Sequence, residues 1–265
     1  MEEGIIMPGF TTHYIFGMKA YNDMPNSQLK HIVAKYRWLY QLGLQGPDIF
    51  FYNIPILRHQ DYRNVGSHMH EHQVSQFFDC CLRHIGLISS RQQKEEAVAY
   101  LAGFINHYIA DSICHPFIYG RIGYDINEPS TKNHGLHAAL ENELDAILLW
   151  KYKKKKPSEF NQTASICLNG QELQFISHFL ASCINETYYP ITYRNNFQVT
   201  PAMVHRSVWA IPFGCRTLAD KSGRKKNSIE FVESLFLKQP VASAKLVTDT
   251  ISNYRNSCNL DHQPW

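Results

Sequence analysis

Hydrophobic residues recur every three or four positions through most of the chain, and this spacing predicts helices. The clearest example covers residues 91–111, where the apolar stripe is wide enough for a long, largely buried helix. That stripe consists of Ala97, Leu101, Phe104 and Tyr108. Proline lacks the amide proton that a helical hydrogen bond needs, so we expect this helix to end before Pro116.

A second strong helix is predicted over residues 134–152, followed by a lysine run that we interpret as a solvated helix end. Similar recurrences predict helices over residues 27–42, 71–87, 170–186, 200–218, 228–237 and 241–253. No segment shows a convincing strand pattern, and residues 120–132 are expected to form an ordered loop over one end of the helices. The chain is therefore expected to be all-α and to form a single domain over residues 1–265.

Composition narrows the possible function classes. Hydrophobic residues make up 44% of the chain, which is ample for a large core, and the formal charge of +3 gives no case for a stable nucleic-acid complex. The seven cysteines contain no C-x-x-C spacing, so neither a thiolate zinc finger nor a disulfide framework is indicated. The amino terminus lacks a signal-peptide pattern and no window is apolar enough to span a membrane, so we expect a cytoplasmic protein.

Two pairs of residues carry the strongest chemical signal. His107 precedes Asp111 by four positions, and His137 precedes Glu141 by four positions. On a helix this spacing places an imidazole and a carboxylate about 5–6 Å apart on one face. Nitrogen and oxygen ligands without thiolate are typical of catalytic zinc sites, and His115 lies one further turn along the first helix. The two pairs therefore predict a metal cluster carried by two helices.

Other residues add to this prediction. Gly103 lies one turn before His107 on the same face and leaves room for another element to approach. Further ligands are offered by His13, by Asp48 in a Gly-Pro-Asp turn, and by His70 in a segment that also contains His68 and His72. Each of these is weak alone, because an ordinary turn, a buried donor or a solvated helix start would explain it equally well.

Read in order, these motifs resemble those of the zinc-dependent phospholipase C family. The resemblance covers residues 8–147, and residues 148–265 would complete the fold with further helices. It rests on His13, Gly-Pro-Asp48, Gly-x-x-Met-His70, His107-x-x-x-Asp111, His115-Pro and His137-x-x-x-Glu141. Members of that family are all-α, bind three zinc ions in a cleft and cleave the glycerol side of a phospholipid phosphodiester, while single-strand-specific zinc nucleases share the fold.

The resemblance implies a role for each matching residue. Asp48, His70, His107 and Asp111 would hold one zinc ion, with Asp111 bridging to a second ion that His13 also binds. The remaining ion would be held by His115, His137 and Glu141. Asp48 would also orient or deprotonate the attacking water. Two or three ions are expected, because secreted members complete one site with a mature amino-terminal tryptophan that this chain lacks, even if translation starts at Met7.

Some ligand assignments stay open at this point. The spacing around His115 departs from that of the secreted enzymes, so His134 or Glu143 is an alternative ligand, and His68 is an alternative to His70. The aromatic residues beside Asp48 and His115 would line a lipid-accepting cleft, although core packing explains them more simply.

Three functions follow from these observations. The first is a zinc-dependent phosphoric-ester hydrolase that uses a metal-bound hydroxide on a phospholipid or another phosphodiester, with transient contact to a membrane surface. The second is a nuclease of the same fold, and the third is a metal-binding protein without turnover. The sequence does not specify the head group or the oligomeric state.

Overall fold

The structure is a computed structural model that describes residues 9–53, 65–123, 131–162, 166–192 and 196–218. Every regular element in these ranges is a helix, which confirms the all-α prediction. The elements are α1 (Phe10–Asp23), α2 (Gln28–Lys35), α3 (Arg37–Gly43), η1 (Gly46–Tyr52), α5 (Val65–Glu71), α6 (Val74–Leu87), α7 (Arg91–Ile122), α8 (Thr131–Lys153), η2 (Pro157–Glu159), α9 (Gly170–Tyr188) and α10 (Pro201–Leu218). The helices predicted over 228–237 and 241–253 lie outside the described residues.

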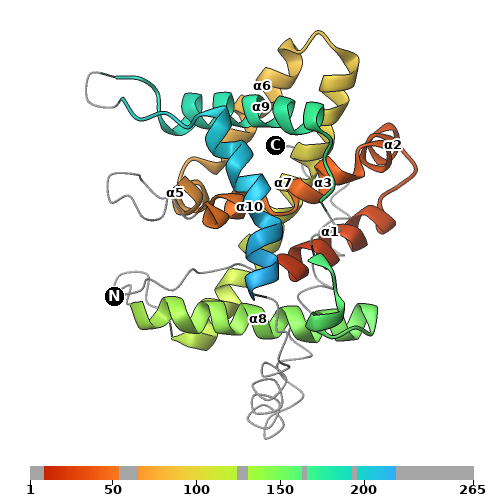
Figure 1. Cartoon of the computed structure of the whole chain (residues 1–265), viewed down its shortest axis with the longest axis vertical. Helices are drawn as coiled ribbons and strands as arrows, with labels where there is room; N and C mark the ends of the chain where they lie inside the picture. The colour runs from red at the N-terminus through yellow and green to blue at the C-terminus, as the bar shows by residue number, and fades with distance from the viewer. Residues whose placement is uncertain (1–8, 54–64, 124–130, 163–165, 193–195, 219–265) are drawn as a thin grey trace, which may run out of the picture.

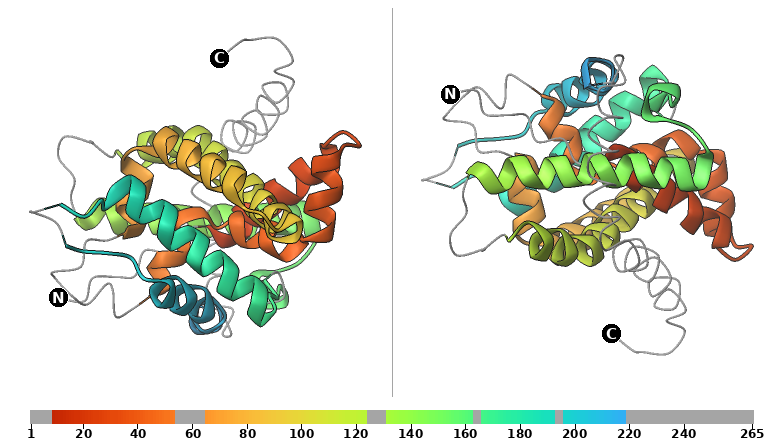
Figure 2. Two further views of the ribbon diagram at one scale, coloured as in Figure 1. Left: turned by 90° about the horizontal axis from the view of Figure 1, so that it is seen from above. Right: turned by 90° about the horizontal axis from the view of Figure 1, so that it is seen from below.

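Helix α7 is the central element of the fold. It contacts α1, α2, α3, α6, α8 and α9, while α8 and α9 lie at opposite ends of the view in Figure 1. The views in Figure 2 show the same arrangement from above and below. Contact between α3 and α7 is closest at Gly43 and Gly103, where a Cβ atom on either residue would collide with a backbone carbonyl of the other helix. The expectation that Gly103 admits a neighbouring element is therefore confirmed.

The prediction that the long helix ends before Pro116 is wrong. Helix α7 continues through Pro116 to Ile122, and Gly123 caps it with a left-handed φ of 64° and donates its amide proton to the carbonyl of Tyr119. Proline removes one helical hydrogen bond, but side-chain packing of the residues after Pro116 holds the helix in place. Ile118, beyond the proline, is buried, and α7 packs against α8. Both ends of the loop expected over 120–132 belong to helices, α7 and α8, and residues 124–130 lie outside the described residues.

Other helix boundaries differ for local reasons. The helix predicted over 27–42 is divided at Tyr36 into α2 and α3, and the one predicted from residue 71 starts at Val74 because Gln73 adopts a left-handed φ of 49°. Side-chain caps begin α2, α7 and α9 at Ser27, Ser90 and Asn169. The sequence patterns did not identify α1, which has no capping residue of its own.

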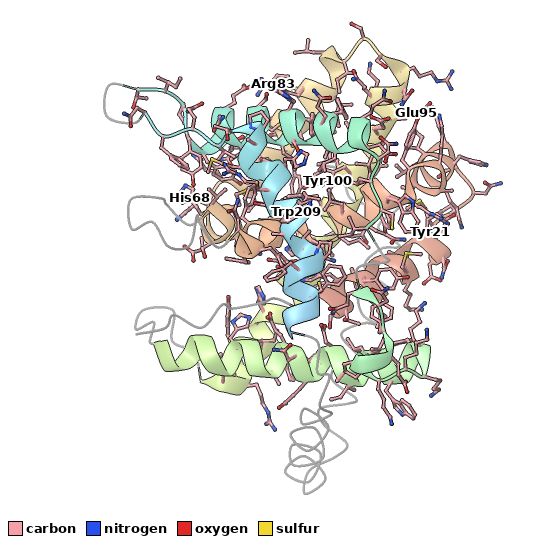
Figure 3. All side chains as sticks on the ribbon, in the orientation of Figure 1. Tyr21, His68, Arg83, Glu95, Tyr100 and Trp209 are labelled. Carbon is pink, nitrogen blue, oxygen red and sulfur yellow. The ribbon has the colours of Figure 1, made fainter. Side chains whose placement is uncertain are left out.

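The main core joins η1, α3, α5, α6, α7, α9 and α10. Tyr100 of α7 lies within it, whereas Trp209 of α10 is exposed (Figure 3). A smaller apolar cluster of Ile15, Leu148 and Leu149 joins α1 to α8. These contacts hold α1, η1, α5 and α8 around α7. None of the helices in the described ranges is both long enough and apolar enough to cross a membrane.

Candidate metal centre

The structure brings together all eight side chains that the sequence proposed as metal ligands. They come from α1 (His13), η1 (Asp48), α5 (His70), α7 (His107, Asp111 and His115) and α8 (His137 and Glu141). Their ligand atoms form three groups, and within each group all of the atoms lie within 4.8 Å of one another. The groups are His13–His107–Asp111, Asp48–His70–His107 and His115–His137–Glu141.

Asp111 is the carboxylate that the largest number of these histidines share. One turn of α7 separates it from His107, whose Nε2 lies 3.1 Å from Oδ2, and another turn separates it from His115, whose Nε2 lies 3.8 Å from Oδ1. Nε2 of His13 lies 3.2 Å from Oδ1 and Nε2 of His70 lies 3.4 Å from Oδ2. Both oxygens of Asp111 therefore face imidazoles from different helices, as a carboxylate that bridges two ions would.

Asp48 reaches the centre because η1 starts at a glycine. Gly46 has a left-handed φ of 48°, and any Cβ atom there would collide with the ring of His107. The Asp48 carboxylate is buried, and its Oδ1 lies 3.1 Å from Nε2 of His70. Its Oδ2 lies 3.9 Å from Nε2 of His13, and no group of the described structure other than the imidazoles of the centre faces the two oxygens as a partner. A buried carboxylate is costly unless positive charge lies beside it, so this site requires protonated imidazoles or a metal ion.

Backbone carbonyls fix the orientation of two of the histidines. Nδ1 of His70 donates to the carbonyl of Gly66 over 2.8 Å, and Nδ1 of His107 donates to the carbonyl of Leu44 over 3.2 Å. A carbonyl only accepts, so Nδ1 carries a proton, and Nε2, which faces the carboxylates, is the nitrogen that would bind a metal ion after losing its own proton. Hydrogen bonding of this kind behind the ligand is usual for histidines that bind metal.

The third group lies where α7 and α8 meet. Nε2 of His137 lies 2.7 Å from Oε1 of Glu141, and Nε2 of His115 lies 3.5 Å from the same oxygen. Tyr119 packs against both imidazoles, with ring centroids 5.3 Å from His115 and 5.4 Å from His137. The pairing of histidine and glutamate at a four-residue spacing thus forms as the sequence predicted.

The pKa shifts show that the charged forms of Asp111 and Glu141 are stabilised by neighbouring imidazoles. Burial by itself lowers the pKa of His13, but Asp111 and Asp48 outweigh this effect and raise the pKa to about 9. The pKa of His70 likewise rises well above its usual value despite burial, because of Asp111 and Asp48. Burial raises the pKa of Asp111, yet His107 and His13 bring it well below its usual range. Protons on the imidazoles supply the charge that divalent ions would otherwise provide.

These residues fit zinc. Imidazole and carboxylate donors converge in groups of three, and the buried Asp48 oxygens lie among them. The alternative ligand His68 instead stacks on Tyr189, and Glu143 belongs to none of the groups found among the described residues. The side chain of His134 lies outside the described residues. The geometry favours the eight original residues, and their assignment as zinc ligands stays a prediction.

The sequence patterns missed one residue that positions this centre. Asp145, one turn after Glu141 on α8, accepts hydrogen bonds from the backbone amides of Thr11 and Thr12 and from the Thr12 hydroxyl. It therefore caps the amino terminus of α1 from a different helix and holds His13 in place. Burial raises the pKa of Asp145 to about 6. Asp145 follows Glu141 by four residues, and this spacing places both carboxylates on one face of α8. The capping of α1 could not be predicted, because a cap supplied by a distant helix leaves no local sequence pattern.

An apolar cavity of about 70 Å³ adjoins the centre. Its walls come from α1, α7 and α8, including Phe16, Phe117 and Leu144, and His13, Asp111, His115 and Glu141 also line it. This volume is several times the roughly 10–15 Å³ that a single water needs. By contrast, Ile49, Phe50 and Tyr52 beside Asp48 are buried in the core. The core-packing interpretation is thus confirmed for those three residues. Phe117, the aromatic residue after Pro116, instead lines the cavity.

Zinc should stabilise this protein more strongly as the pH rises. In the metal-free protein, the raised pKa of His13 gives stability that is fully present below pH 6.5 and is lost as the pH rises through about 9. Zinc requires the unprotonated nitrogen, so its binding competes with protons across the same window. We expect the increase in Tm on adding zinc to be larger at the upper end of this window than at the lower end, as measured by differential scanning fluorimetry. An equal or falling increase would contradict the involvement of His13.

Comparison with known proteins adds an independent finding. A family model described as zinc dependent phospholipase C matches residues 12–189. This range contains all eight residues of the centre and extends through α9, beyond the segment that carries the motifs. No curated protein and no solved structure matches the chain.

Proposed function

The chain belongs to the zinc-dependent phospholipase C family, and we propose that it hydrolyses the phosphodiester bond on the glycerol side of a phospholipid. One observation carries this proposal: the convergent histidines and carboxylates share a wall with an apolar cavity. Charged groups suited to a phosphate therefore lie directly beside a space suited to hydrocarbon. We also propose that α9 and α10 complete a single domain, since both contribute to the main core.

The three groups would hold two or three zinc ions. Asp48, His70, His107 and Asp111 would hold one, Asp111 would bridge to a second that His13 also binds, and His115, His137 and Glu141 would hold a third. When bound, zinc lowers the pKa of water to about 7 and offsets the negative charge that builds up on a phosphoryl group.

Asp48 is the candidate for handling the proton of the attacking water. Its carboxylate is buried and faces imidazoles within the described structure, with Oδ1 3.1 Å from Nε2 of His70. It can therefore accept a proton or a hydrogen bond from a reacting water. His70 and His107 cannot do this with Nδ1, because backbone carbonyls hold those protons.

Differences in exposure indicate how the substrate approaches. The His107 side chain is only 1% exposed, whereas those of His70 and His115 are each 22% exposed. The phosphate would therefore enter from the side of His70 and His115, with His107 at the base. Phe16, Phe117 and Leu144 would meet the apolar part of the lipid next to the bond that breaks. The cavity is small, so it would take a short hydrocarbon segment rather than a whole acyl chain.

A substrate panel tests the proposal. The full chain, loaded with zinc, is assayed on phosphatidylcholine vesicles for release of choline phosphate, on single-stranded DNA for release of nucleotides, and on a nitrophenyl phosphodiester. We expect turnover of the lipid that a chelator abolishes and zinc restores. His107→Ala and Glu141→Ala should each lose zinc and this activity, because each removes a ligand from the centre.

His178→Ala is the matched control, because His178 is an exposed histidine of α9 outside all of the groups. It should retain the zinc content and the activity of the wild-type protein. Cleavage of DNA without cleavage of lipid would replace the proposal with a nuclease of the same fold. Bound zinc without turnover of any substrate would indicate a metal-binding protein, and full zinc content in both ligand variants would refute the assignment of the centre.

A further inference from the structure

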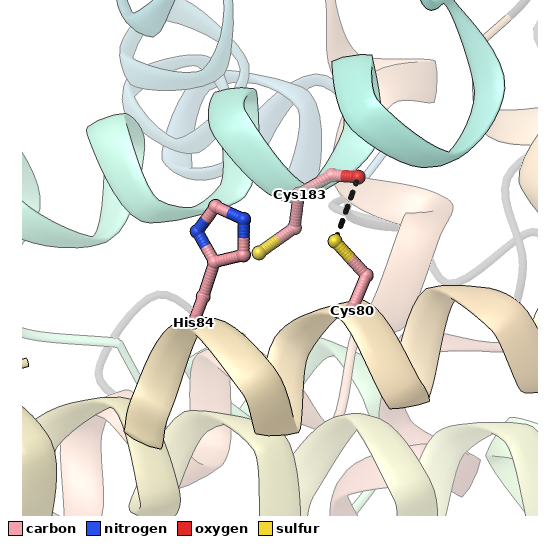
Figure 4. Close-up of side chains that lie close together, drawn as sticks. All are labelled: Cys80, His84 and Cys183. Atoms are coloured by element: carbon pink, nitrogen blue, oxygen red, sulfur yellow. Dashed lines mark hydrogen bonds between the residues drawn. The ribbon is translucent and has the colours of Figure 1, made fainter. Parts of the chain in front are cut away.

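A second group of metal-ligating side chains lies between α6 and α9. Cys80 and His84 come from α6, Cys183 comes from α9, and their ligand atoms all lie within 4.8 Å of one another. Figure 4 shows the three side chains converging in the space between the two helices. Neither helix carries any of the eight residues of the first centre. This group is therefore structurally separate from the hydrolytic site.

Helix geometry produces part of this arrangement. Cys80 and His84 are four residues apart on α6, so their side chains lie on one face of that helix. Packing of α6 against α9 then brings Cys183 opposite them. Both cysteines are buried, with Cys80 2% and Cys183 0% exposed, while the His84 side chain is 26% exposed. The group thus has a shielded sulfur end and an opening to solvent beside the imidazole.

The ligand types determine which ion would bind. Two sulfur atoms and one imidazole nitrogen form a soft donor set, which favours zinc and similar thiophilic ions over calcium or magnesium. The first centre has only nitrogen and oxygen donors and suits a catalytic ion. We propose that Cys80, His84 and Cys183 form a separate binding site for a thiophilic divalent ion of the zinc class, which links α6 to α9.

A fourth ligand is available at the open side. Glu186 lies three residues after Cys183 on α9, and its Oε2 lies 2.7 Å from Nε2 of His84. Its other oxygen lies 2.6 Å from Arg83 at the surface. A tetrahedral site needs one ligand beyond the three, and this carboxylate or a water would supply it from the open side. Without an ion, the Cys80 thiol makes a weak 3.8 Å contact with the carbonyl of Cys183.

Cobalt(II) provides a direct test, because it adopts the geometry of zinc and gives a near-ultraviolet charge-transfer band only when thiolates bind it. The full chain is reduced, freed of metal and titrated with cobalt. We expect this band in the wild-type protein and its loss in Cys80→Ala and in Cys183→Ala. None of the eight residues of the first centre is a cysteine, so cobalt bound there does not contribute to the band. This readout is independent of hydrolytic activity.

Cys215→Ala is the matched control. Cys215 is a free, buried cysteine of α10 and is not part of the group. Its truncation leaves a cavity of similar size and should preserve the band. Absence of the band from the wild-type protein would overturn the proposal whether or not any variant folds. Persistence of the band in Cys80→Ala, or its loss in Cys215→Ala, would overturn it as well.

Discussion

An Asp48→Asn variant should keep most of its zinc and lose phosphodiester turnover by about 100- to 10,000-fold, the range typical of a missing general base. Asparagine has nearly the same size as aspartate and keeps one oxygen that can coordinate an ion. It carries no negative charge and cannot accept a proton at neutral pH. The buried carboxylate of Asp48, which faces only imidazoles within the described structure, is the reason to expect this separation of metal binding from turnover. Zinc content is measured by elemental analysis, and turnover by initial rates on vesicles.

Asp23→Asn is the control for this substitution. Asp23 is a half-exposed carboxylate at the end of α1 that pairs with Lys19 at the surface. Its replacement should change neither zinc content nor rate. Unchanged turnover in Asp48→Asn would remove the proposed role of Asp48 in handling the water proton. If zinc and activity were lost in parallel, Asp48 would act as a ligand only.

Asp111→Ala should have the largest effect on metal binding. Its carboxylate faces four histidines from α1, α5 and α7, so its removal affects every ion that those histidines would hold. Loss of residues that merely support a ligand already weakens metal binding by about 10- to 100-fold. Removal of a shared ligand should exceed that range, lower the zinc content by at least one ion per chain and abolish turnover. Competition with a chelator of known affinity measures the loss of zinc affinity.

Asp79→Ala provides the comparison, because Asp79 is an exposed carboxylate of α6 outside the centre. It should bind zinc as the wild-type protein does. Wild-type affinity in Asp111→Ala would show that Asp111 does not bridge ions. The ions held by His13 and by Asp48 and His70 would then occupy independent sites.

Much of the centre could be predicted from local spacing. An α-helix has 3.6 residues per turn, so a histidine and a carboxylate four residues apart meet on one face wherever the helix lies. The pairs His107–Asp111 and His137–Glu141 form for this reason. The same periodicity predicted α7, α8, α9 and α10. Proline was a poorer guide, because packing beyond Pro116 compensates for the missing hydrogen bond.

The choice among neighbouring histidines required the tertiary structure. His68 and His70 both lie on α5, two residues apart, and so point in different directions. Packing of α5 against η1 turns His70 toward Asp48 and leaves His68 against Tyr189. No pattern within the segment distinguishes these two outcomes, since both residues would satisfy the same motif.

The amino-acid sequence alone predicted most of the longer helices, the chemical character of the ligands and the spacing of those that share a helix. The tertiary structure decided which helices face one another, and therefore the joining of three ligand groups around α7, the capping of α1 by Asp145 and the meeting of Cys80 and His84 with Cys183. The physical reason is that distances within a helix are set by its backbone geometry, whereas distances between helices depend on how their surfaces pack. Close contacts such as that of Gly43 with Gly103 set those distances, and they involve residues far apart in the chain.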